Sequence, residues 1–296
     1  MTESNNVYPY RALFETLLNY EADVMKTRLK CEGDEEDTAL NDTNPATAGA
    51  NTGLKAREAK FNNSKVVRLI GRLHSDLCHQ EKLIAPGLKL DVQLVPARPP
   101  FFIKPAAPAD SAVQVLYNYH IVSTRFLIHF KELSESLVKS HKEIVMAENK
   151  KYIIPHTKVS MKKLNIPSGG TSYTFDNVFK GKLPDRIALA MVADAAATGS
   201  YTANPFNFQN FGLNYIALSA NSQMIPRIAL EPNIATQDYL RENLSVMEAM
   251  GYDTGPYTWA ITPTQWATGH NWVFKVTPDP IGGLHSKQLN GAISLG

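Results

Sequence analysis

The feature that most restricts the possible folds is a strict alternation of apolar and polar residues at 88–95. The run Leu-Lys-Leu-Asp-Val-Gln-Leu-Val puts four aliphatic side chains on one face and Lys89, Asp91 and Gln93 on the other. A period of two residues is typical of a β-strand with one buried face. Shorter apolar runs stand between Gly, Pro and Asn residues at 187–192, 214–219 and 271–276. Many short strands with such turn residues predict a mainly β fold of the sandwich or jelly-roll kind.

Further strands are expected at 65–79, 112–130 and 152–164, and a short one at 101–103 inside a proline-rich stretch. Asn221-Ser222 lies between two apolar runs and indicates a β-hairpin. Helices are expected at 9–29, where Pro9 suits a first turn, and at 131–149. The acidic and amide-rich segment 31–64 is expected to be a long surface loop.

Composition excludes several classes of protein. The only cysteines are Cys31 and Cys78, so a disulfide framework is excluded. No stretch approaches the roughly 20 apolar residues of a membrane span, and the first residues do not read as a signal peptide. The net charge is only +2, but 125–163 holds nine Lys and Arg against four Asp and Glu. That bias indicates a solvated helix face, with a weak nucleic-acid contact as the alternative.

No motif assigns catalysis, a metal or a cofactor, so the sequence predicts a protein that is not an enzyme. The sharpest cluster is His74, Asp76, Cys78 and His79, of which the first three would share one face of a strand. A zinc site needs about four convergent ligands, and no partner set is evident. We therefore expect no catalytic residues and no metal ligands.

An aromatic stretch at 201–208 has two interpretations. Tyr201, Phe206 and Phe208 flank amides and Pro205, an arrangement that suits a stacking platform for sugars or bases. The alternative is an Asn-Pro turn whose rings anchor a loop on the sheet, which the turn chemistry favours.

Five blocks carry a resemblance to a known family. They are VYPYR with ETLL at 7–18, LIGRLHSD at 69–76, GKLPDR at 181–186, GSY with NPFNF at 199–208, and TPD at 277–279. In this order the chain resembles the hexon-type major capsid proteins of adintovirus and Polinton (Maverick) elements, virus-derived proteins found in invertebrate genomes. The chain departs from that pattern at 265–272, where Trp266 and Trp272 stand in place of a more acidic stretch.

The resemblance implies a double jelly-roll: a first sandwich over 1–155, with the loop 31–64, and a second over 156–296. Strands of the family are expected to be missing at both ends, so that the final run 291–296 reads as a strand without a partner. The implied function is a capsid subunit of a DNA virus or virus-like transposon, assembled in the host cytoplasm or nucleus. Its implied partners are further copies in a homotrimer and capsid lattice, other capsid proteins and, weakly, nucleic acid.

Two other hypotheses remain at this point. One is a β-sandwich module that binds carbohydrate or protein through Tyr201, Phe206 and Phe208. The other is a metal-dependent enzyme built around His74 and Cys78.

Overall fold

A computed structural model describes residues 7–46, 51–80, 82–84, 88–105, 117–147, 152–253, 259, 261–269, 271–276 and 290–295. Helices make up 33% and strands 15% of the structure, so the expected mainly β double jelly-roll is wrong. The described strands form one four-stranded sheet and one two-stranded sheet. All of them lie after residue 174, so no sheet occurs in the described part of the expected first sandwich. The domain boundary near residue 155 stays a prediction.

The larger sheet is antiparallel throughout, with the order β1-β6-β3-β4. Its strands are β1 (Phe175–Lys182), β6 (Asn290–Leu295), β3 (Ile216–Ala220) and β4 (Gln223–Leu230). Strand β6 pairs with β1 through Phe175 and Leu295 and with β3 through Leu218 and Leu295. The expectation of an unpaired strand at 291–296 is therefore wrong, because this strand lies inside the sheet.

The hairpin predicted from Asn221-Ser222 is confirmed as the connection between β3 and β4. Both turn residues have positive φ angles, 50° and 64°, which match the right-handed twist of two antiparallel strands. Strand β4 also contains Pro226, and it lies at the edge of the sheet. An edge strand tolerates a proline because its outward backbone groups need no ladder partner.

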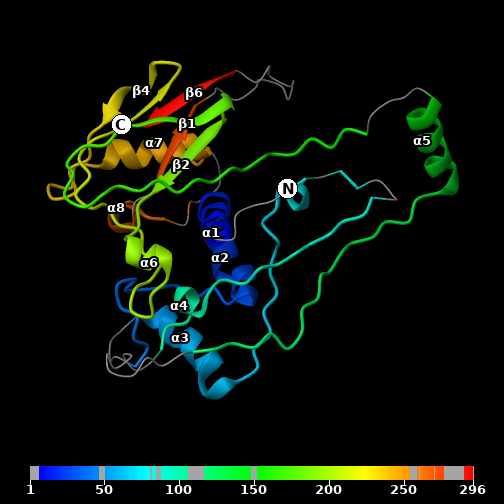
Figure 1. The fold of residues 1–296 in the computed structure, drawn as a ribbon, viewed down its shortest axis with the longest axis horizontal. Coiled ribbons are helices and arrows are strands. Elements are labelled where there is room, and N and C mark those ends of the chain that lie inside the picture. Colours follow the sequence, from blue (N-terminus) through cyan, green and yellow to red (C-terminus); the bar gives the residue numbers. More distant parts are fainter. Residues whose placement is uncertain are drawn as a thin grey trace.

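The smaller sheet pairs β2 (Arg186–Ala190) with β5 (Asn271–Lys275), which confirms the strands expected at 187–192 and 271–276. Helix α7 (Leu240–Met250) contacts β5, and the short helix α8 (Pro263–Gly269) contacts α7 (Figure 1). Trp266 and Trp272 are both 1% exposed, and their ring centroids lie 5.1 Å apart. Trp266 and Trp272, which depart from the capsid-protein resemblance, thus pack against each other inside the core.

The N-terminal helix prediction is confirmed, with one interruption. Helices α1 (Tyr8–Asn19) and α2 (Ala22–Lys26) meet at Tyr20 and Glu21, and the 3₁₀ helix η1 (Arg28–Glu32) follows. Glu21 forms a β-bridge with Trp259, whose Nε1 donates to the Leu17 carbonyl at 3.1 Å. These contacts tie the first helices to the C-terminal part of the chain.

The expected loop 31–64 is only partly a loop. It contains the helix α3 (Thr52–Phe61) and the 3₁₀ turn η2 (Asn62–Ser64). The Asn51 side chain caps α3 by accepting from the backbone N–H groups of Gly53 and Leu54, at 3.1 and 3.3 Å. The loop interpretation is wrong for 52–61, where Asp37 pairs with Arg57 and Glu35 with Lys60 instead of remaining solvated.

The proline-rich stretch forms a helical turn, α4 (Pro99–Phe102), and not the short strand expected at 101–103. Its two prolines occupy the first helical positions, where a missing N–H costs nothing. Gly199, at the end of helix α6 (Asp194–Thr198), lies so close that a Cβ there would come within 3.2 Å of the Phe101 backbone nitrogen. α4 and α6 therefore pack tightly against each other.

The helix expected at 131–149 is confirmed as α5 (Glu135–Ala147). It lies at the far end of the molecule from the sheets, at the tips of long extended traces (Figure 1). Four expected strands are wrong, because their residues pair with no strand in the described part: 65–79, 88–95, 117–130 and 152–164. Within the first of them, Asp76–His79 form the 3₁₀ helix η3. Residues 112–116 lie outside the described part. No helix of the described part is both long enough and apolar enough to cross a membrane.

Candidate functional site

The most unusual surface consists of four extended segments, 65–75, 88–98, 117–134 and 152–167. They carry large apolar side chains in contact with solvent, of which Phe130 is 86% and Val66 81% exposed. The others include Leu69, Ile70, Leu88, Leu90, Val92, Leu94, Val95, Ile121, Val122, Phe126, Leu127, Ile128, Leu133, Ile153 and Ile166. Large apolar side chains exposed in this number favour an interaction site, because single subunits rarely leave so many of them in water.

Helix α5 continues this surface. Leu137, Ile144 and Val145 recur at helical spacing and are exposed, while Lys139 and Lys142 lie between them in sequence. A helix whose apolar stripe faces water has lost the contact that normally stabilises it. The extended segments and α5 therefore share one property, which is an apolar face that the described residues leave uncovered.

Two lysines of the basic region 125–163 contact aromatic rings of the same chain. Lys162 lies over the Phe179 ring at 5.2 Å from its centroid and donates to the Val178 carbonyl. Lys163 lies 5.0 Å above the centroid of Tyr10, and burial lowers its pKa from the ordinary value. These two charges bind the chain's own rings, so a nucleic-acid contact would rest on the others.

A second candidate is a polar cluster where α1 meets the segment 74–79. The Oε2 atom of Glu15 lies 2.6 Å from His74 Nδ1 and 3.6 Å from His79 Nε2. The Oε1 atom of Glu15 accepts from Arg11 Nε at 2.7 Å, and Arg11 also forms a buried ion pair with Asp76. Both Arg11 and Asp76 are almost completely buried.

The charges in this cluster are set by opposing effects. Burial acts to raise the pKa of Glu15, but hydrogen bonds from His74 and Arg11 outweigh it and hold the pKa below its ordinary value. Burial lowers the pKa of His79, although Glu15 acts in the opposite direction. Glu15 is therefore an anion at neutral pH, and the ring of His79 keeps a lone pair available.

The sequence pointed to a different set in this region. His74, Asp76 and Cys78 were expected on one face of a strand, but Asp76–His79 form the 3₁₀ helix η3. The ligand atoms that come together in the described part belong to Glu15, His74 and His79, and Cys78 is exposed. Asp76 is engaged by Arg11 and by the backbone N–H of Val159 at 3.2 Å. Glu15 was missed because it lies 59 residues before His74, and no local pattern links the two.

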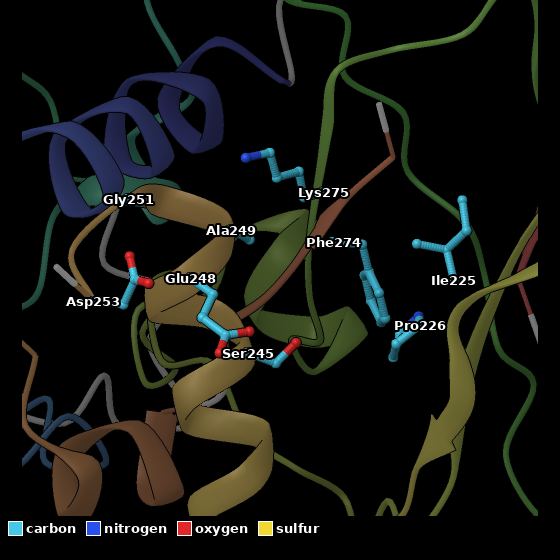
Figure 2. A pocket seen from close by; sticks show the side chains of 9 residues that line it. All are labelled: Ile225, Pro226, Ser245, Glu248, Ala249, Gly251, Asp253, Phe274 and Lys275. Atoms are coloured by element: carbon cyan, nitrogen blue, oxygen red, sulfur yellow. The ribbon is translucent and has the colours of Figure 1, made fainter. Parts of the chain in front are cut away.

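A cavity of about 530 Å³ lies between α7, β4 and β5 (Figure 2). Glu248, Asp253, Lys275 and Ser245 supply its polar groups, and Phe274, Ile225 and Pro226 line one side. Its lining contains no histidine or cysteine, so it offers no nucleophile paired with an imidazole base.

The aromatic residues 201–208 contact other rings of the chain. Phe206 lies 5.9 Å from Tyr10 and 5.7 Å from Phe101, centroid to centroid, and Phe208 is buried against Phe14. Tyr201 packs edge-on against Tyr117 at 5.4 Å. The Asn-Pro turn is also present, since Asn204 Oδ1 accepts from the Phe206 N–H at 3.0 Å. Ligand binding by these rings stays a prediction, because their described contacts are internal.

Comparison with known proteins gives one weak similarity. No family model matches the chain, and no solved structure matches it. The chain is 20% identical over 249 residues to the uncharacterized protein F54H12.2 of Caenorhabditis elegans. The match covers 83% of this chain and 55% of that protein, so the chain spans about half the length of its relative.

Proposed function

We propose that this chain is a self-assembling structural subunit of a capsid-like shell. The observation that carries the proposal is the exposed apolar surface of the four extended segments and α5. The proposal does not include a double jelly-roll, which the structure lacks.

The physical argument starts from the cost of leaving these side chains in water. Burying one large aliphatic or aromatic side chain stabilises a protein by about 1.5–3 kcal/mol. More than a dozen such side chains are exposed along the extended segments. Covering even part of them supplies the free energy that holds subunits together, after the loss of freedom on association.

Copies of the same chain are the occupants that best suit this surface. Extended backbone without a ladder partner offers a row of N–H and C=O groups to a strand of another molecule. In a closed symmetric ring, the same segment of every copy packs against a neighbouring copy. No apolar edge then remains exposed to solvent. A homotrimer that packs into a larger lattice, with other shell proteins, is the arrangement expected from the family that the five sequence blocks resemble.

The remaining parts of the proposal follow from the same resemblance. The shell would enclose the DNA of a virus or virus-like transposon, with assembly in the host cytoplasm or nucleus. The lysines of 125–163 that do not contact Phe179 or Tyr10 would give a weak contact with nucleic acid.

Sedimentation velocity of the purified chain, with and without substitutions on one segment, tests the proposal. Leu90→Asp with Leu94→Asp puts two carboxylates on the apolar face of 88–95. Each buried charge costs at least about 1.4 kcal/mol, so association should weaken by roughly 100-fold or more. Circular dichroism should remain unchanged, because both leucines are exposed in the single chain.

The matched control is Lys89→Asp with Gln93→Asp, which adds the same residues to the polar face of the same segment. This variant should assemble as the original chain does. A chain that sediments as a stable monomer at every concentration contradicts the proposal, and so does equal loss of assembly in both variants.

A further inference from the structure

The cluster of Glu15, His74 and His79 has the composition of a metal site. One carboxylate and two imidazoles bring their ligand atoms to within 4.8 Å of one another. Glu15 comes from α1, His74 precedes η3, and His79 ends it, so the fold itself brings the three together. We propose that these side chains bind a divalent transition metal ion, of which Zn²⁺ is the expected species.

The donor set decides the class of metal. Two imidazole nitrogens and one carboxylate oxygen suit Zn²⁺ and its first-row neighbours, whereas Ca²⁺ and Mg²⁺ prefer oxygen ligands alone. Zinc has ligand distances of about 2.0–2.2 Å, so its tetrahedral ligands lie roughly 3.3 Å apart. The separation of 3.6 Å between Glu15 and His79 is close to that value.

The other separations need only small side-chain movements. Glu15 and His74 are 2.6 Å apart, a hydrogen-bond distance, and an ion between them would open that contact by about 0.7 Å. The two rings lie with their centroids 5.5 Å apart and tilted by 35°. His79 is at the end of a short 3₁₀ helix and its side chain is 31% exposed, so a small rotation of its ring brings a nitrogen toward the ion.

The surroundings orient the ligands as those of metal sites do. Arg11 holds the Oε1 atom of Glu15, which leaves Oε2 directed at both histidines. Asp76 balances the charge of Arg11, so the guanidinium does not cancel the attraction of Glu15 for a cation. The Tyr8 hydroxyl oxygen accepts from the backbone N–H of His74 at 3.1 Å and fixes that segment against α1. Such outer contacts raise metal affinity by holding ligands in place.

Solvent access to the cluster determines what occupies the fourth coordination position of the metal ion. The side chain of His74 is 5% exposed, but that of His79 is 31% exposed, so solvent reaches the site from the His79 side. A site with three protein ligands and an open position binds water or an exogenous ligand as its fourth. His74 belongs to the extended segment 65–75, but its side chain is buried, and the metal site uses none of the exposed apolar side chains that carry the proposed function. Zn²⁺ binding and assembly can therefore fail separately.

Calorimetric titration of Zn²⁺ into the full chain, expressed without a histidine tag and stripped with chelator, tests the site. One equivalent should bind, and Co²⁺ should give the visible absorption of a tetrahedral complex. His79→Ala should lower the Zn²⁺ affinity by at least about 100-fold while leaving the fold intact, because the ring is partly exposed. Glu15→Gln should weaken binding in the same direction.

The matched control is His156→Ala, which removes another exposed histidine that lies outside the cluster. This variant should bind Zn²⁺ as tightly as the original chain. The inference is overturned if the original chain binds no stoichiometric Zn²⁺, or if His79→Ala binds it as tightly as the original chain does.

Discussion

Glu35 links two segments of the N-terminal region through opposite charges. Its carboxylate lies 2.6 Å from Lys30 Nζ at one oxygen and 2.5 Å from Lys60 Nζ at the other. Lys30 belongs to η1 and Lys60 to α3, so one acidic residue joins two helices. This role differs from the solvated acidic loop that composition alone suggests.

The hydrogen bonds from Lys30 and Lys60 lower the pKa of Glu35 to about 2. The carboxylate is charged more readily in the folded chain than in the unfolded one, so its stabilisation is complete above about pH 4.5. It is lost as the pH falls from 4.5 toward 2. We expect Glu35→Gln to lower the free energy of unfolding by up to about 1 kcal/mol at pH 7, since the pair is solvent-screened.

Urea denaturation at pH 7, 4.5 and 3 measures this difference, which should shrink as the pH falls. Glu36→Gln, at the exposed neighbouring position, serves as the control and should change stability little at any of the three pH values. A Glu35→Gln effect that is equally large at pH 3 and pH 7 contradicts the assignment.

At the scale of elements, helix α3 depends on Asn51, the capping residue that precedes its first turn. Asn51 is 1% exposed, and its side-chain oxygen accepts from Gly53 and Leu54 and also from the Thr38 N–H at 3.2 Å. Asn51→Ala removes all three acceptor contacts at once. The expected loss in the free energy of unfolding is about 1–2 kcal/mol.

Chemical denaturation measures the loss, and hydrogen exchange at 52–55 should accelerate locally. Asn51→Asp keeps an acceptor oxygen at the same position and should retain most of the stability. If Asn51→Ala and Asn51→Asp are equally destabilised, the side-chain cap does not hold α3.

Elements with a local signal were predictable from the sequence. The hairpin at Asn221-Ser222 follows from two residues that tolerate positive φ, and α1 and α5 follow from their apolar spacing. The segment 88–95 shows the limit of that reasoning, because a two-residue period defines faces but not a strand partner. The Glu15 cluster shows a second limit, since only the packing of α1 on 74–79 brings those residues together.

At the scale of the whole molecule, the chain divides into a packed part and an uncovered part. The packed part has a core between α7, α8 and the sheets, which includes Trp266, Trp272, Leu218, Leu230 and Val246. The extended segments and α5 reach away from that core (Figure 1). Under the proposed assembly, the sheets and their core stabilise the single chain, and the extended segments become buried only when copies associate.

Hydrogen exchange on assembled and monomeric fractions of the same preparation measures whether the extended segments become covered when copies associate. In assembled fractions, amides at 88–95 and 119–130 should exchange at least about 10-fold more slowly than in the monomer, while those of β3 remain slow in both. Rapid exchange at 88–95 and 119–130 in every assembled fraction contradicts the proposed assembly.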